Sequence, residues 1–297
     1  MRTVGTFEEV RMLGQGTVGL VPTMGFLHEG HLSLIDTARH ECDTVVMSLF
    51  VNPLQFDESR DLSSYPRDLE RDASLAAGRG VDVLFAPEME EMYPEQPLTR
   101  VSVAEITEEM EGAHRPGHFA GVATVVAKLF AGTQAARAYF GRKDAQQLAT
   151  VTRMAADLSM PVEVVPVPII REQDGLALSS RNVFLSEEER IRALAISSSL
   201  MEAADAVERG ERSPLAVEAI VRAGLAGLEI DYVTLADAET SRSIDTFVAD
   251  AFLAVAARVG ATRLIDNVFF RVSVDGADAD RGRRLDAPSI LYEHERS

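Results

Sequence analysis

The feature that most constrains the fold is a repeated alternation, in the first half of the chain, of short apolar runs with longer helical patterns. Such an alternation is typical of βαβ units and therefore of a parallel sheet. Because these crossovers are right-handed, we expect the helices on both faces of one sheet. The pattern predicts strands at 18–22, 44–51, 81–86, 138–140 and 162–170, and helices at 31–41, 67–79, 122–133 and 145–158.

The pattern changes after residue 182. A long helical stretch at 186–209 is followed by a second helix at 214–225. Pro214 suits a first helical turn, and Ser213 is a suitable cap for it. Three strand candidates come next, at 230–235, 251–259 and 263–272.

These patterns together predict an α/β protein with two domains. We expect a Rossmann-like, doubly wound parallel sheet at 1–183 and a smaller C-terminal α+β domain at 184–272, which would act as a lid. The remaining segment, 273–297, is charged and rich in Gly and Ala, which predicts a flexible tail.

The charge balance limits the classes of partner. A net charge of −18 argues against binding to nucleic acid or to an anionic membrane surface, because their phosphates would be repelled. Of 29 basic residues, only Lys128 and Lys143 are lysines. In a chain so biased towards Arg, a Lys can mark a place that needs a compact, mobile ammonium. Lys128 can equally be explained as a surface residue on a helix.

The sequence also predicts a cytoplasmic protein. No apolar run approaches the roughly 20 residues that a bilayer helix needs, and the first residues lack the pattern of a signal peptide. Cys42 is the single cysteine, so no internal disulfide can form, in agreement with a reducing compartment.

Unusual polar residues collect just after the predicted strands. In open α/β sheets, ligands bind beyond the carboxyl ends of the strands, so these positions are the first candidates for a site. Four strand ends contribute, which is stronger evidence than any single motif. The residues are His28 and His31, Asn52 and Gln55, Gly141, Lys143 and Asp144, and Ser179, Ser180 and Arg181.

The histidine pair allows three interpretations. His28 and His31 are neighbours on one face if a helix begins near Glu29. A metal pair lacks the accompanying Cys, His or Glu spacing, and a pair of helix caps or core residues needs no function at all. At a helix N-terminus, however, free N–H groups favour a phosphate, and two imidazoles can donate to its charge. The other strand ends favour this third interpretation.

Lys143 and the loop at Ser179 fit a phosphate in the same way. The Lys143 ammonium could act as a point charge, although a surface lysine before a helix is an equal alternative. Asn52, Gln55 and Gln147 are neutral amides that could hold carboxylate and hydroxyl groups. Phosphate-loop, nucleophile-elbow and dinucleotide motifs are absent, so direct displacement at phosphorus is the expected chemistry.

These motifs resemble a known family. His28-Glu-Gly-His31 resembles the His-x-Gly-His signature of the nucleotidyltransferase superfamily, and the wider set of motifs resembles the pantothenate synthetases. The resemblance covers the chain to about residue 270. It is carried by residues 22–34, 49–56, 65–68, 117–122, 140–147, 174–182, 231–235 and 262–267.

The resemblance implies a reaction and a homodimer. The family condenses pantoate with β-alanine, using ATP and Mg²⁺, through a pantoyl-adenylate, and releases AMP and pyrophosphate. His31 would be the catalytic acid, assisted by His28, Lys143 and Arg181, while Gln55, Gln147 and Asn52 would hold pantoate. No residue is assigned as a metal ligand. ATP would bind to Thr23, Met24, Gly25, His28, His31, Gly141, Lys143, Asp144, Ile170, Leu178, Ser179, Ser180 and Arg181.

Three positions depart from the usual family pattern. Leu178 replaces a frequent Met, which is nearly neutral in volume, whereas Arg142 replaces a frequent Glu and Ala145 a frequent Tyr beside Lys143. Two alternatives stay open: another transferase of the superfamily that acts on a phosphorylated acceptor, and a nucleotide-binding regulator without turnover.

Overall fold

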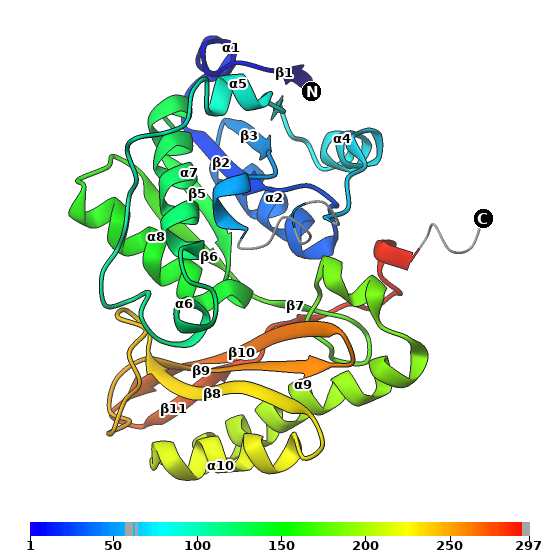
Figure 1. The fold of residues 1–297 in the computed structure, drawn as a ribbon, viewed down its shortest axis with the longest axis vertical. Helices are drawn as coiled ribbons and strands as arrows, with labels where there is room; N and C mark the ends of the chain where they lie inside the picture. Colours follow the sequence, from blue (N-terminus) through cyan, green and yellow to red (C-terminus); the bar gives the residue numbers. More distant parts are fainter. Residues whose placement is uncertain (57–61, 63–64, 293–297) are drawn as a thin grey trace. The chain divides into compact units, whose positions relative to one another are not determined.

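The computed structural model describes residues 1–56, 62 and 65–292, and these residues form two compact units (Figure 1). The first unit takes the described residues of 1–104, 115–141 and 150–167, and the second takes those of 105–114, 142–149 and 168–292. The division therefore differs from a single boundary at residue 184. The physical reason is that the segment after Val167 pairs with residues near the C-terminus.

The first unit is built on a parallel sheet, as expected. The order of its described strands is β1-β4-β3-β2-β5-β6, and every neighbouring pair is parallel. The order reverses at β2, which lies between β3 and β5, so the carboxyl ends of β2 and β5 form the topological switch point. The strands are β1 (Arg2–Val4), β2 (Val18–Thr23), β3 (Thr44–Leu49), β4 (Val83–Phe85), β5 (Arg137–Gly141) and β6 (Glu163–Val167).

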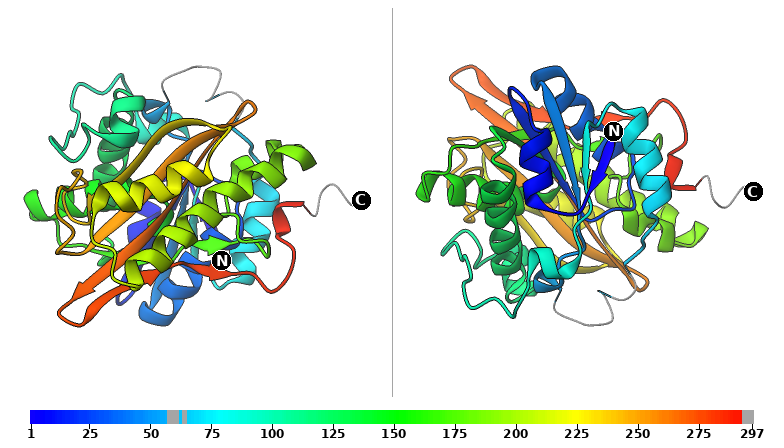
Figure 2. Two further views of the ribbon diagram at one scale, coloured as in Figure 1. Left: turned by 90° about the horizontal axis from the view of Figure 1, so that it is seen from below. Right: turned by 90° about the horizontal axis from the view of Figure 1, so that it is seen from above.

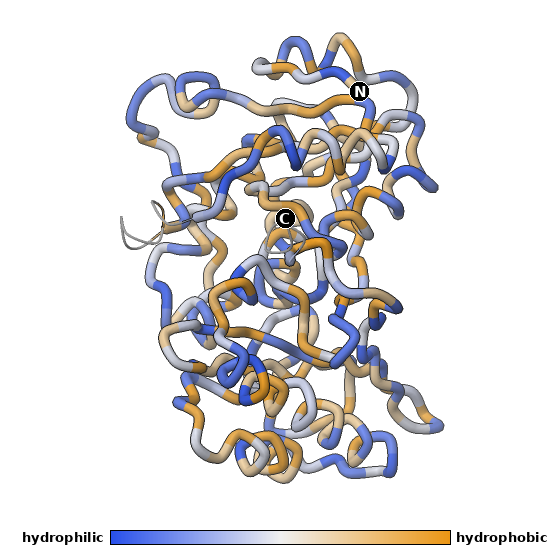
Figure 3. The backbone as a smooth tube through the Cα atoms, turned by 90° about the vertical axis from the view of Figure 1, so that its right-hand side faces the viewer, coloured by the Kyte–Doolittle hydropathy of each residue, from blue (hydrophilic) through white to orange (hydrophobic). Residues whose placement is uncertain are grey.

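Helices flank this sheet. Helix α2 packs along β2, β3 and β5, and α7 packs along β2. Figure 3 shows hydrophobic and hydrophilic stretches alternating along the backbone. The helices of this part of the chain are α1 (Phe7–Leu13), α2 (Glu29–Glu41), α4 (Leu69–Gly78), α5 (Met89–Met92), α7 (His118–Thr133) and α8 (Ala145–Asp157).

The second unit is an antiparallel sheet with two helices across one face (Figure 2, left). Helices α9 (Glu187–Glu208) and α10 (Pro214–Gly224) share a buried apolar core with the sheet, centred on residues such as Leu200 and Val255. Helix α6 (Met110–His114) packs on β8. The strands, in the order β11-β10-β9-β8, are β8 (Glu229–Asp237), β9 (Ala251–Val259), β10 (Thr262–Ser273) and β11 (Gly276–Asp280).

Two expectations from the sequence need correction. The strand expected at 162–170 ends at Val167, because Pro168 has no N–H to donate to a ladder. A separate strand, β7 (Ile170–Arg171), pairs instead with β12 (Arg283–Arg284).

The tail expected to be flexible is largely structured. Strand β11 turns back at Gly276 and pairs with β10, and Ala277 and Leu291 are buried. The sequence did not predict this pairing because the segment is charged, and because a strand of five residues is too short to show a clear periodic pattern. Residues 293–297 of the expected tail lie outside the described residues. Among the described helices, none is long and apolar enough to cross a membrane.

Candidate active site

Helix α2 begins with an unusual cap made by the two histidines. His28 is the N-cap, and its Nδ1 accepts a hydrogen bond of 3.1 Å from the Gly30 N–H. The Nδ1 of His31 accepts one of 3.3 Å from the His28 N–H, and the two ring centroids lie 4.1 Å apart. Gly30 permits this geometry, because a Cβ there would stand 2.7 Å from the His28 ring. The two imidazoles therefore form a reciprocal capping box.

Two other helices show what this cap normally requires. Helix α1 is capped by Thr6 with Glu9, and α9 by Ser186 with Glu189, the residue types that usually make a capping box. The structure thus confirms that the two histidines cap the helix. Capping does not by itself require imidazole side chains, because Thr6 with Glu9 and Ser186 with Glu189 form the same kind of cap. Since each Nδ1 accepts a backbone N–H, the hydrogen of a neutral ring is on Nε2, which makes Nε2 a donor.

A buried carboxylate anchors the turn that leads to this cap. Asp72, fully buried on α4, accepts hydrogen bonds of 2.7 Å from the N–H groups of both Phe26 and Leu27. Phe26 has a φ of 52° and Gly25 a φ of 92°, so the turn adopts a conformation that most residues avoid. Burial raises the pKa of the Asp72 carboxyl, while its two N–H partners act in the opposite direction. The sequence did not single out Asp72, although this residue comes shortly after residues 65–68, one of the motifs that carry the family resemblance.

Amide side chains connect the ends of β2 and β3. The Nε2 of Gln55 lies 3.0 Å from the Sδ of Met24, and the Nδ2 of Asn52 donates 3.1 Å to the Oε1 of Gln55. The Oδ1 of Asn52 accepts from the hydroxyl of Tyr93 at 3.0 Å. Burial raises the pKa of Tyr93 to about 12, so this hydroxyl remains a donor at neutral pH. Met24, Asn52 and Gln55 therefore come together in the first unit, as the sequence predicted.

The turn that carries Gln55 is fixed from α7. The Nδ1 of His118 lies 2.8 Å from the Gln55 carbonyl oxygen, and the Nδ2 of Asn52 donates 3.1 Å to the Gly121 carbonyl. A Cβ on Gly121 would come within 2.1 Å of the Leu54 carbonyl oxygen, so only glycine permits this close approach. His118 and Gly121 belong to a motif that carried the family resemblance, but the sequence reasoning gave them no role.

Lys143 lies in a 3₁₀ turn, Arg142–Asp144, in the second unit. The Nδ2 of Asn267 donates to the carbonyl oxygens of Arg142 at 3.0 Å and Lys143 at 2.8 Å. The Arg142 guanidinium pairs with Asp280 at 2.6 Å and lies 5.1 Å from the centre of the Phe269 ring. The turn is therefore anchored to strands β10 and β11.

The departures from the family pattern in this region are accommodated. Arg142 has a carboxylate partner, Ala145 is buried against Met110 and Phe252, and Leu178 is buried. Gln147 is partly buried on α8.

The remaining predicted residues lie around a second 3₁₀ turn, Ser180–Phe184. The Leu178 N–H donates 2.9 Å to the Ile170 carbonyl, which brings these two residues together. The Oγ of Ser179 caps the turn by accepting from the Arg181 N–H at 3.3 Å. Asn182 fixes the turn by donating to buried Glu172 at 2.8 Å.

The predicted site residues are thus divided between the two units. The first unit brings together Met24, Asn52 and Gln55, and separately pairs His28 with His31. Thr23 closes β2 by donating to the Ser48 carbonyl, and Gly141 ends β5. Among the described residues, no three His, Cys, Asp or Glu side chains are grouped so that they could hold a metal ion.

Comparison with known proteins gives a consistent result. Residues 1–269 match the family model described as pantoate-beta-alanine ligase. A pantothenate synthetase of Desulfitobacterium hafniense (strain DSM 10664 / DCB-2) is 53% identical over 259 residues, which cover 86% of this chain and 92% of the relative.

Solved structures agree with this result. The pantothenate synthetase of Thermus thermophilus superimposes with a TM-score of 0.86 at 50% identity, covering 90% of this chain and 98% of that one. The pantoate-beta-alanine ligase of Francisella tularensis, complexed with beta-gamma ATP and beta-alanine, gives 0.70 at 31% identity, covering 91% and 97%. The chain therefore belongs to the pantoate-β-alanine ligase family.

Proposed function

We propose that this chain condenses pantoate with β-alanine at the expense of ATP, through a pantoyl-adenylate, and that its site residues serve this reaction. The observation that carries the proposal is the imidazole capping box of His28 and His31 at the N-terminus of α2. It combines the positive end of the helix dipole with two Nε2 donors, both of which favour a phosphate.

In the first step, a carboxylate oxygen of pantoate attacks the α-phosphorus of ATP, the bond to the β-phosphate breaks, and pyrophosphate leaves. Negative charge builds on the phosphate oxygens during this displacement. We assign His28 and Lys143 to stabilise that charge and His31 to act as the acid, with Arg181, Ser179 and Ser180 on the outer phosphates. The remaining ATP contacts are assigned to Thr23, Met24, Gly25, Gly141, Asp144, Ile170 and Leu178.

The amide residues are assigned to pantoate. Gln55 is held in place by Asn52 and by the His118 contact to its carbonyl, so its side-chain amide is preorganised. Gln147 is proposed as the second amide, on α8. In the second step the β-alanine amine attacks the acyl carbon, loses a proton and displaces AMP.

Mg²⁺ is proposed to enter with ATP. This ion is usually held by one or two carboxylates together with substrate phosphates and water. The described residues hold no group of three His, Cys, Asp or Glu side chains placed to bind a metal, so the oxygen donors for this ion would come mainly from the phosphates of ATP and from water. Homodimeric assembly and a cytoplasmic location stay predictions.

The proposal is tested by incubating the protein with ATP, pantoate and β-alanine and measuring pyrophosphate release and product. We expect pantoate-dependent pyrophosphate release in a single turnover without β-alanine, and AMP release on its addition. Absence of pantoate-dependent release would contradict the proposal. Binding of ATP without any product would instead support a nucleotide-binding regulator, and turnover only with a phosphorylated acceptor would support another transferase.

Variants separate chemistry from capping. His31→Ala and Lys143→Ala should each slow single-turnover adenylation by about 10² to 10³, because an oriented charge stabiliser is lost, while pantoate affinity changes less. His28→Ser separates the two roles of His28, because Ser is a good N-cap and keeps the capping function but carries no imidazole. Wild-type adenylation in all three variants would show that the histidines and Lys143 have only structural roles.

A further inference from the structure

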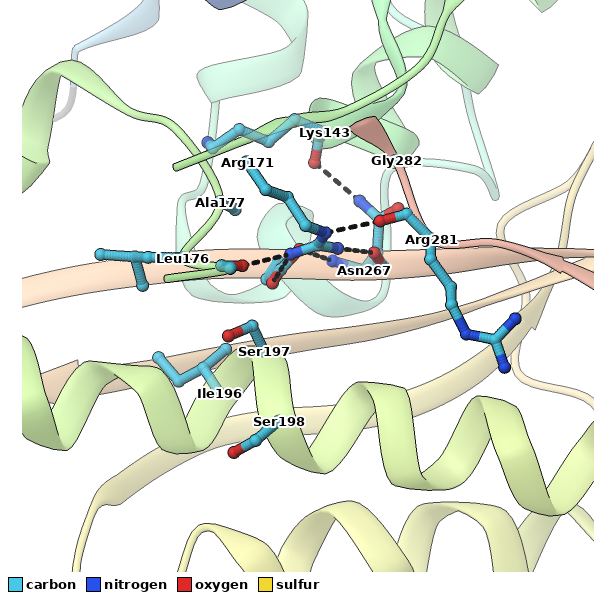
Figure 4. A network of polar contacts seen from close by, with 12 residues as sticks. Lys143, Arg171, Leu176, Ala177, Ile196, Ser197, Ser198, Asn267, Arg281 and Gly282 are labelled. Atoms are coloured by element: carbon cyan, nitrogen blue, oxygen red, sulfur yellow. Dashed lines mark hydrogen bonds and ion pairs between the residues drawn. The ribbon is translucent and has the colours of Figure 1, made fainter. Parts of the chain in front are cut away.

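One side chain in the second unit holds the backbone of the Lys143 turn. Asn267 lies on β10 with only 2% of its surface exposed. Its Nδ2 group donates to two successive carbonyl oxygens, that of Arg142 at 3.0 Å and that of Lys143 at 2.8 Å. Figure 4 shows the contact with Lys143. The side chain of Lys143 leads away from this contact. Asn267 therefore touches the main chain of Lys143 and leaves its ammonium available.

The two hydrogen bonds require a particular kind of side chain. A primary amide carries two N–H groups, one for each carbonyl, on a short and neutral stem. An aspartate of the same shape would present only acceptors to two carbonyl oxygens, and an alanine would leave both carbonyls without this donor. Serine has a single hydrogen to donate. The choice of residue at 267 therefore decides whether these two carbonyl oxygens of the Arg142–Asp144 turn are held.

Asn267 is itself fixed by a buried ion pair. Arg171 and Asp266 form two hydrogen bonds, of 2.7 and 3.0 Å, and each side chain is 2% exposed. Arg171 also donates to the Asn267 carbonyl at 3.2 Å, and the Asn267 N–H donates to Asp266 at 2.7 Å. A third contact joins Arg171 to the Arg281 carbonyl at 2.6 Å. The main chain of Asn267 is thus held on both sides, which makes its side chain a rigid support.

We infer that Asn267 is a positioning residue for adenylation, which sets the place of the Lys143 ammonium by holding the backbone of its turn. This inference rests on the role proposed for Lys143. The physical reason is that a point charge stabilises a transition state only when it is correctly placed, and a displacement of about 1 Å can cost about 10² in rate. Asn267 touches no reacting atom in this scheme, so its effect must pass through Lys143.

The test is a double-mutant cycle on single-turnover adenylation. Asn267→Ala should slow pantoate-dependent pyrophosphate release by about 10-fold to 10²-fold, with little change in the KM for pantoate. In the Lys143→Ala background the same change should slow the reaction by less than about 3-fold, because the charge that Asn267 positions is already absent. Asn267→Ser should recover part of the rate, and Asn267→Asp should recover none.

A neighbouring residue supplies the matched control. Val268 follows Asn267 on β10 but belongs to the apolar core, so Val268→Ala should lower stability without slowing adenylation. Urea unfolding of each variant shows whether it is folded under assay conditions. If Asn267→Ala does not fold, Asn267→Ser and Asn267→Asp carry the comparison.

The outcomes separate the positioning role of Asn267 from the function proposed for the chain. Equal slowing by Asn267→Ala in the wild-type and Lys143→Ala backgrounds would overturn the positioning role, and so would equal slowing by Val268→Ala. A wild-type rate for Asn267→Ser and Asn267→Asp would overturn it as well. Failure of the proposed function is seen elsewhere, because the wild-type protein would then show no pantoate-dependent pyrophosphate release. Failure of the role proposed for Lys143 would appear as a wild-type rate of adenylation in Lys143→Ala alone.

Discussion

The turn at His28 and the turn at Lys143 are proposed to act on the same phosphate, yet they are held in different ways. The His28 turn is capped by its own side chains, within three residues of one another. The Lys143 turn is held by Asn267 and Asp280, which are more than 120 residues away in the sequence. One turn is thus organised locally and the other by remote partners.

The difference has a physical consequence for the effects of mutation. A local cap depends on one helix end and is lost only when that end changes. A turn held by remote strands depends on the folding of all the segments that support it. Changes far from Lys143 should therefore reach it, whereas the His28 turn should respond mainly to its own residues and to Asp72.

The largest effect is expected from breaking the buried ion pair of the remote support. Asp266→Ala leaves the Arg171 charge uncompensated in a site that is 2% exposed, which should lower the free energy of unfolding by about 3 to 5 kcal/mol. Urea unfolding measures this loss. Asp157→Ala is the control, because Asp157 pairs with Arg153 at 2.8 Å on an exposed helix face and should cost less than about 1 kcal/mol. Similar losses in the two variants would contradict the account.

A smaller effect is expected at Asp72, a non-local support of the His28 turn. Asp72→Ala removes both acceptors from the N–H groups of Phe26 and Leu27, which should cost about 1 to 3 kcal/mol in a buried site. Adenylation should slow in parallel, because the turn that leads to His28 loses its anchor. Thr6→Ala, which removes the cap of α1, should cost about 1 kcal/mol with no change in adenylation. A wild-type adenylation rate in Asp72→Ala would show that the turn is organised by its own residues alone.

The smallest effect is expected at the outer edge of the remote support. Arg281 pairs with Glu208 at 2.7 Å and lowers the pKa of that carboxyl, mainly through a side-chain hydrogen bond. A lowered pKa in the folded state gives a stabilisation that is present above the unfolded value and is lost as the pH falls through the folded one. Arg281→Ala should therefore cost less than about 1 kcal/mol at pH 7, and the difference from wild type should disappear in acid. Unfolding curves at several pH values test this, and a difference independent of pH would exclude the ion pair as its source.

The sequence predicted those features that depend on residues close to one another along the chain. The parallel sheet, α2 with its histidines and the two later helices each have a periodic pattern or a cap within a few residues. The contact between Met24 and Gln55 could also be predicted from the sequence, because the carboxyl ends of parallel strands lie at the same edge of a sheet.

The remote partners could not be predicted in the same way. Asp72 and Asn267 act through backbone groups of distant segments, and a hydrogen bond to a main-chain atom leaves no pattern in the sequence of the segment that receives it. The pairing of β7 with β12 is likewise a contact between two pairs of residues, which is too short to give a periodicity. Asp72 and Asn267 lie in or near motifs that carried the family resemblance, but the resemblance did not assign a role to either residue.

The pair of Arg142 with Asp280 has a consequence for how such enzymes diverge. Asp280 lies 2.6 Å from the Arg142 guanidinium, so a Glu at position 142 would replace this attraction by a repulsion between two carboxylates. The sign of the charge at 142 should therefore constrain the residue tolerated at 280. Grafting the Lys143 turn of one family member into another would then succeed only when the strand end that faces it is exchanged as well.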